Sequence, residues 1–230
     1  MTDTNSSNNS LTFDVEAAPE FSFLTVNLPA GRTVKVEASA MAAMDTNISM
    51  KTKMKGGFKR FFAGESLFIN EFTAQGGAGK LSIAPYCAGS IQHVSLNNQT
   101  IYLQSSAYLA SSPEISVDVK WQGMKKGFFS GESFFLVKCS GTGDLWFNTF
   151  GAMLRIDEID PNFVVDSGHI VAFTEGVNYN IEKFGGYKSL FLSGEGFVCR
   201  FNGQGTVWIQ SRKPTSFLGW LNHYRPVGKN

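Results

Sequence analysis

The sequence predicts an all-β protein built from three tandem β-sandwich-like repeats. Two observations carry this prediction: one motif occurs three times, and short runs alternate apolar with polar residues. The motif consists of an apolar run, a Gly-Glu turn, a second apolar run and a closing Gly-x-Gly turn. This order is typical of strand–turn–strand–turn–strand units. The three copies begin at Phe61, Phe128 and Phe191.

The repeated unit is longer than this motif. The runs 34–41, 101–108 and 163–170 match one another, and the first two copies align without a gap at the offset of 67 residues that separates Leu24 from Ile91. Because chance does not preserve order and spacing together, triplication is indicated. The repeats span about 20–85, 86–148 and 149–213, with five or six strands each. Units of this size bury their apolar faces poorly alone, so residues 11–213 are predicted to form a single domain about a pseudo-threefold axis.

The strands themselves are short and alternating. Val34 and Val36 point to one face with Lys35 on the other, and Ile101 and Leu103 repeat the pattern. Asp166-Ser167-Gly168 predicts a tight turn, in which the Asp caps the backbone and the Gly accepts a positive φ.

The two ends of the chain differ from the repeats. Residues 1–10 are almost wholly polar and are predicted to be a disordered tail. The C-terminal extension, 214–230, carries apolar residues at helical spacing after Pro214, which predicts a short helix or coil. Those residues are Phe217, Leu218, Trp220, Leu221 and Tyr224. We interpret this element as a lid over one barrel end; the alternative is a docking or membrane segment.

Composition narrows the class of protein. The chain of 230 residues is 43% hydrophobic, so its core needs no disulfide or metal, and its formal net charge of +1 gives no chain-wide attraction to nucleic acid. The three cysteines are widely spaced and are predicted to be reduced thiols. Without a signal peptide or a long apolar run, a cytoplasmic location is expected.

These landmarks together resemble the altered-inheritance-of-mitochondria, protein twenty-four, family. The matching features are the three Gly-Glu turns, the closing run 206–212, and three similar strand ends. In each strand end, Val or Leu is followed by an acidic or amide residue and then by small residues. The resemblance covers about residues 20–213. It implies three modules similar to the tryptophan RNA-binding attenuator protein, arranged about a pseudo-threefold axis, and no established enzymatic activity. Mitochondrial relatives are associated with inner-membrane organisation, whereas this chain lacks an Arg-rich transit peptide.

The equivalent carboxylates of the three Gly-Glu turns, Glu65, Glu132 and Glu195, are the most suggestive acidic set. A ring of three could bind a cation or perform acid–base chemistry. A Glu beside a turn glycine equally accepts backbone N–H bonds, and we favour this structural role. The Gly-x-Gly turns lack the further glycine and the helix that a phosphate loop needs. No enzyme, cofactor or metal site is therefore predicted.

Interleaved cations and aromatic residues offer a candidate contact surface, which consists of Lys55, Phe58, Lys59, Arg60, Lys125 and Lys126. Such residues can meet an anionic membrane surface or stack on bases, although alternation can also place them as solvated turns over the core. We predict a non-enzymatic binding or scaffold protein that acts at a membrane surface or in a protein assembly. The alternative is an RNA-binding or small-ligand-binding protein. A protein partner or an anionic membrane is favoured over RNA, and free sheet edges allow a homo-oligomer.

Overall fold

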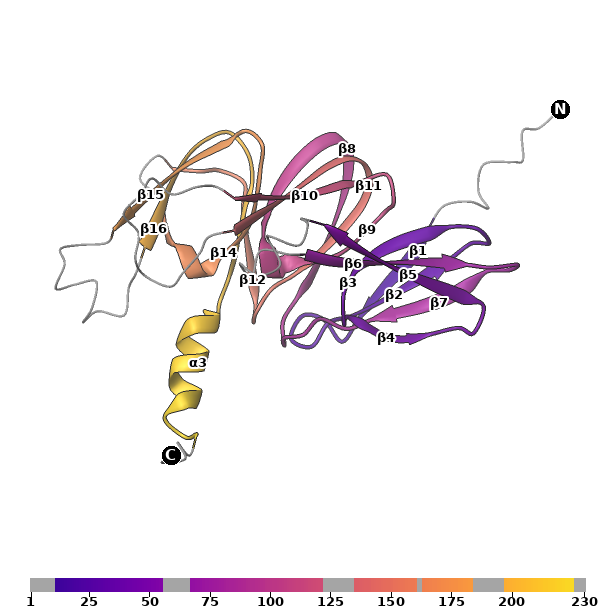
Figure 1. The fold of residues 1–230 in the computed structure, drawn as a ribbon. Helices are drawn as coiled ribbons and strands as arrows, with labels where there is room; N and C mark the ends of the chain where they lie inside the picture. The colour runs from indigo at the N-terminus through magenta and orange to yellow at the C-terminus, as the bar shows by residue number, and fades with distance from the viewer. Residues whose placement is uncertain (1–10, 56–66, 122–134, 161–162, 184–196, 226–230) are drawn as a thin grey trace.

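A computed structural model describes residues 11–55, 67–121, 135–160, 163–183 and 197–225. The predicted all-β class is confirmed: strands dominate the described residues, and a short helix follows them near the C-terminus. The expected disordered tail, 1–10, lies outside the described residues. Figure 1 shows the strands as three groups in a row, with the N-terminal group at one end and the C-terminal group at the other.

The first segment, residues 23–83, forms two sheets with an added N-terminal strand. Its elements are β1 (Thr12–Glu16), β2 (Phe23–Leu28), β3 (Thr33–Glu37), β4 (Met41–Met44), β5 (Ile48–Lys55), β6 (Leu67–Ala74) and β7 (Gly79–Ile83). One sheet has the order β1-β2-β7-β4, and β3, β6 and β5 lie side by side in the other. Because side chains alternate along β3, Val34 and Val36 both point to the face opposite Lys35. There they pack in one core with Phe72 and Leu81.

The second segment, residues 91–148, contains the two longest strands. Its elements are β8 (Ile91–Gln104), the 3₁₀ turn η1 (Ser105–Ala107), β9 (Tyr108–Ser111), β10 (Ser116–Trp121) and β11 (Phe135–Asn148). β8 and β11 pair along their lengths, and Figure 1 shows them as long curved ribbons.

The predicted Gly-x-Gly turn at 141–143 is wrong in this segment. Both glycines lie inside the continuous strand β11, at a register shift in its pairing with β8. Gly141 has a φ of +135°, and a Cβ there would lie 2.7 Å from the carbonyl oxygen of Glu114. The glycines therefore bend one strand, where the sequence pattern indicated a break between two.

The third segment, residues 153–210, completes the row. Its elements are β12 (Met153–Ile156), β13 (Val164–Asp166), the 3₁₀ turn η2 (Ser167–His169), β14 (Ile170–Thr174), β15 (Val177–Lys183), β16 (Phe197–Gly203) and β17 (Val207–Gln210). β13, β16 and β15 form a three-stranded sheet, and Phe173, Cys199 and Phe201 fill the core between it and the neighbouring strands.

The turn at 166–168 confirms half of its prediction. The Asp166 side chain accepts a hydrogen bond from the backbone N–H of Gly168 at 2.8 Å, as an Asp-capped turn requires. Gly168 does not have the positive φ that we expected. A larger residue would meet a neighbour instead: a Cβ would lie 2.6 Å from Cε of Lys213, so the Lys213 side chain would have to shift.

One pairing scheme is found in all three segments. In the first, β7 lies between β2 and β4, and β6 lies between β3 and β5. In the second, the long strand β11 takes both central places. Its C-terminal half lies between β8 and β9, and its N-terminal half lies between β8 and β10. In the third, β17 lies between β12 and β14, and β16 between β13 and β15.

Two strand pairs join the segments. β3 pairs with β9, with Lys35 opposite Ser111 and Val36 opposite Ala110. β8 pairs with β14, with Tyr102 opposite Phe173. These junctions connect ten strands of the three segments into one sheet, which runs through the row in Figure 1.

The C-terminal helix is present as α3 (Pro214–Asn222). Pro214 occupies its first turn, where a missing N–H costs nothing. The interpretation of this helix as a lid is wrong: none of its residues is buried, and Figure 1 shows it projecting away from the strands.

Candidate functional site: the exposed face of the C-terminal helix

Most of the residues that the sequence singled out lie outside the part of the chain that the structure describes. Lys55 is the last residue of β5, where its backbone pairs with Leu67. Its predicted companions Phe58, Lys59, Arg60, Lys125 and Lys126 lie outside the described residues, and so do the turn carboxylates Glu65, Glu132 and Glu195. Their roles as a contact surface and as turn ligands stay predictions.

Five of the exposed large apolar side chains among the described residues lie together on α3 and the turn after it. We call this surface the apolar helix face; its members and their exposed fractions are Phe217 39%, Leu218 54%, Trp220 56%, Leu221 44% and Tyr224 71%. At 100° per residue these side chains cover one side of the helix, while Thr215, Ser216 and Asn222 lie on the other. A contiguous exposed apolar surface often marks an interaction site, whereas single exposed apolar residues need no explanation.

Aromatic rings of the apolar helix face contact one another in a row that begins at the body of the protein. Phe217 packs edge-on against Phe150, with ring centroids 5.4 Å apart, and stacks with Trp220 at 5.9 Å. Tyr224 follows Trp220 at 5.2 Å. The guanidinium of Arg212 lies 5.9 Å from the Phe150 ring and so adds a cation to the base of this row. The apolar helix face is therefore a connected set of rings, fixed to the third segment at one end.

A buried ion pair holds the start of the helix. Nζ of Lys213 lies 3.1 Å from Oδ2 of Asp166, and the two side chains are only 7% and 12% exposed. The Lys213 stem also packs over Gly168. The helix therefore leaves the body from a fixed point at the end of β13.

The charged residues of the sequence from Gln210 onward are all positive. From Gln210 to the last residue the sequence contains Arg212, Lys213, Arg225 and Lys229 and no Asp or Glu. Arg212 and Arg225 are exposed, whereas Lys213 is engaged with Asp166. The apolar helix face thus lies in a stretch of sequence whose exposed charged residues, Arg212 and Arg225, are both cations.

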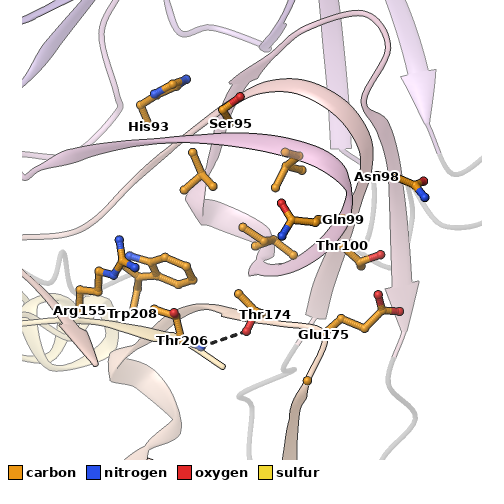
Figure 2. Close-up of a pocket in the computed structure, with 14 residues that line it drawn as sticks. His93, Ser95, Asn98, Gln99, Thr100, Arg155, Thr174, Glu175, Thr206 and Trp208 are labelled. Carbon is orange, nitrogen blue, oxygen red and sulfur yellow. Dashed lines mark hydrogen bonds between the residues drawn. The ribbon is translucent and has the colours of Figure 1, made fainter. Parts of the chain in front are cut away.

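A pocket of about 530 Å³ lies where β8 meets the third segment (Figure 2). Figure 2 shows the Arg155 side chain beside the ring of Trp208; its guanidinium lies 5.7 Å from the ring centroid. Nε of Arg155 donates to both carboxylate oxygens of Asp157, at 2.9 and 3.1 Å. On the floor, the Thr206 N–H donates to Oγ1 of Thr174 at 3.0 Å.

Two ionisable wall groups of this pocket, His93 and Arg155, are already engaged with carboxylates of the protein. Nε2 of His93 and Oδ1 of Asp144 are 2.8 Å apart, and the His93 ring packs on Phe13 and Trp146. Among the described residues, no three His, Cys, Asp or Glu side chains are grouped to hold a metal ion. The pocket is best explained as the groove left where two segments join.

One carboxyl group is desolvated in the first segment. Burial raises the pKa of Glu37 to about 7, and burial also raises the pKa of the nearby Cys87 thiol. The residues at the same place in the other segments behave differently: Gln104 accepts from Ser106, and Asp166 accepts from Gly168 and Lys213. The three positions are therefore not a symmetric acidic site.

Sequence reasoning found the apolar residues of α3 and misassigned their environment. Spacing identifies which side of a helix is apolar, but it does not reveal what covers that side. The absence of Asp and Glu after Gln210 was the available indication of a surface role.

This geometry is that of an all-β protein with three segments of strands and an exposed helix. The family model described as "Mitochondrial biogenesis AIM24" matches residues 13–212, and the chain belongs to this family, as its resemblance predicted. The chain is 27% identical to an uncharacterized protein of Streptococcus pyogenes serotype M6, over 96% of this chain and 94% of the relative. It is also similar to a Streptococcus pyogenes protein whose X-ray crystal structure was solved by a structural genomics consortium. That match has a TM-score of 0.80 and 27% identity, and it covers 94% of this chain and 100% of the other.

Within the described ranges, no helix is long and apolar enough to cross a bilayer.

Proposed function

We propose that this protein is a non-enzymatic scaffold that attaches to an anionic membrane surface through α3. The observation that carries the proposal is the apolar helix face, whose five large side chains are each at least 39% exposed. Leaving this much apolar area in water is unfavourable, and a lipid interface removes the cost without requiring the chain to cross the bilayer.

The chemistry of the helix favours lipid over a protein groove. Trp220 and Tyr224 have apolar rings with polar tips, the combination that settles at the level of lipid headgroups. Arg212 and Arg225 border the face, and each cation near an anionic surface contributes about 1 kcal/mol. The one-signed charge of the C-terminal region would repel a basic partner and attract anionic lipid.

The body of the protein would act as the scaffold. We infer that the three segments are copies of one β-sandwich-like unit, as in the attenuator-protein fold. What supports this is the shared strand-pairing scheme. The pseudo-threefold axis stays a prediction, because no sheet pairing between the third segment and the first is found among the described residues.

We further propose that the protein is not an enzyme and acts on the cytoplasmic side of its membrane. Support for the first point comes from the pocket, whose His93 and Arg155 are each paired with a carboxylate. Support for the second comes from the free cysteines Cys87, Cys139 and Cys199, which suit a reducing compartment.

Vesicle flotation tests the membrane proposal. The full chain should float with vesicles of phosphatidylglycerol and phosphatidylcholine and float far less with phosphatidylcholine alone. Trp220→Ser removes the largest ring of the apolar helix face and should weaken binding by about tenfold, equivalent to about 1.4 kcal/mol. Added salt should weaken binding further because the Arg212 and Arg225 contributions are screened.

The matched control is Leu154→Ser. Leu154 is 58% exposed on β12, close to the 56% of Trp220, but it is not part of the apolar helix face. This variant should float like the parent. A parent that stays at the bottom of the gradient with anionic vesicles would rule the proposal out, and equal losses for both variants would show that α3 is not the contact.

A further inference from the structure

One strand edge is left open at each end of the row. Among the described residues, β4 pairs only with β7, and β13 pairs only with β16. Every residue of β4 is exposed, including Met41 at 36% and Met44 at 41%. Every residue of β9, which has the same place in the second segment, is buried. An open edge presents unpaired N–H and C=O groups as well as side chains.

The two junctions inside the chain show what such edges pair with. In each, an outer strand of one segment pairs antiparallel with an outer strand of the next: β3 with β9, and the second half of β8 with β14. The registers also agree. Val36 lies opposite Ala110 in the first junction, and Leu103 lies opposite Ala172 in the second. Matching positions thus meet at both junctions, so the chain uses one type of joint twice.

A register shift of the same kind accompanies β4, β9 and β14, which have matching places in the three segments. It falls between Met41 and Ala43 in β4, where β4 pairs with β7. It falls between Trp146 and Phe147 opposite β9, and between Ile170 and Ala172 in β14. β4 therefore has the backbone irregularity of the two strands that already form joints, but it has no partner from a preceding segment.

Side-chain contacts at one position stabilise each of the two joints, β3 with β9 and β8 with β14. Lys35, opposite Ser111, donates from Nζ to the carbonyl oxygens of Pro113 and Ile115 at 2.7 and 2.8 Å. Tyr102, opposite Phe173, stacks on it with ring centroids 5.4 Å apart. The corresponding residues of the open edges are Val164 of β13 and Met44 of β4, which are both apolar and so are suited to each other.

We propose that β13 of one molecule pairs with β4 of a second copy of this chain, which repeats the internal joint between molecules. The strands run antiparallel, with Val164 opposite Met44 of the second copy and Val165 opposite its Ala43. This contact is head-to-tail, so copies add in one direction and form either a closed ring or an open filament, depending on the rotation per step. The proposal is independent of membrane binding, because it uses no residue of α3.

The first test measures mass in solution without lipid. The weight-average mass of the full chain, from sedimentation velocity or light scattering, should rise with concentration above that of one chain. Met44→Lys and Val164→Lys each place a cation in one half of the joint, and each should reduce the protein to a single chain. Met50→Lys is the control: Met50 is 49% exposed on β5 and outside the joint, and its variant should associate like the parent.

The decisive test mixes the two damaged proteins. Met44→Lys retains an intact β13, and Val164→Lys retains an intact β4, so an equimolar mixture should form a one-to-one dimer that grows no further. This gain of mass requires both proteins to be folded, so misfolding cannot imitate it. If two copies associated symmetrically through β4 alone, Val164→Lys would still dimerise by itself and mixing would add nothing.

A charge exchange tests the register. The double variant Met44→Glu/Val164→Lys places opposite charges face to face in every joint and should regain association that each single variant loses. Met44→Lys/Val164→Lys should remain a single chain. A parent that is a single chain at every concentration, a mixture without dimers, or a double variant no better than its singles would each overturn the proposal.

Discussion

At the scale of single residues, Glu37 is a carboxyl group whose pKa lies well above its ordinary value. It ends β3 half-buried, and burial raises its pKa to about 7, whereas the ordinary value is 4.5. The folded protein therefore binds a proton here that the unfolded chain releases at lower pH. The stabilisation from protonated Glu37 is complete below about pH 4.5 and is lost as the pH rises through about 7.

Glu37→Gln should remove this pH dependence. Gln is the residue at the matching position of the second segment, Gln104, and it carries no charge to desolvate. Between pH 5 and pH 8 we expect the free energy of unfolding of the parent to fall by an extra amount on the order of 2 kcal/mol relative to Glu37→Gln. Urea titrations at both pH values measure the difference.

Glu16→Gln provides the comparison, because Glu16 is an exposed carboxylate at the end of β1. Its variant should follow the pH profile of the parent. If Glu37→Gln follows it as well, the Glu37 carboxyl is hydrated in the folded protein and its burial does not govern stability.

At the scale of elements, the attachment of α3 depends on the Lys213–Asp166 pair. Lys213→Met keeps the apolar stem over Gly168 but leaves Asp166 buried without its cation. Removal of one member of a buried pair costs roughly 3 kcal/mol. We expect that loss in the free energy of unfolding, measured by urea denaturation.

The Lys213→Met/Asp166→Asn double variant should recover much of the loss, because an amide can still accept the Gly168 N–H without a buried charge. Arg200→Ala is the reference for an exposed pair: Arg200 and Glu182 are 51% and 39% exposed, and this variant should lose under about 1 kcal/mol. Equal losses for Lys213→Met and Arg200→Ala would mean that the Lys213 pair is no stronger than a surface contact.

Sequence patterns predicted the existence of elements better than their ends. Apolar spacing identified α3 and the alternating strands because both depend on local periodicity. Gly141 and Gly143 led to the wrong prediction of a turn, because glycines with positive φ occur in strand bulges as well as in hairpin turns. Whether β11 ends at Gly141 or continues is decided by its partner β8, about forty residues away in the chain, and local sequence does not contain that information.

At the scale of the whole molecule, the repeated motif predicted three similar segments but not how they join. The joint at Val36 and Ala110 depends on a strand edge meeting another from the next segment. The exposure of Phe217 to Tyr224 likewise depends on the direction in which the chain leaves β17. Candidate contact residues such as Lys59 and Lys125 were predicted from the interleaving of cations with aromatic residues, and they lie outside the described residues.

The joint between consecutive segments has a consequence for synthesis on the ribosome. β3 ends at Glu37, but its partner β9 is complete only at Ser111. At 5–20 residues per second, roughly 4–15 seconds pass before that partner exists. The newly made edge of β8 then waits in the same way for β14. Nascent chains on neighbouring ribosomes thus expose compatible edges at the same time, and a pause in translation near residue 100 would favour pairing between the wrong chains.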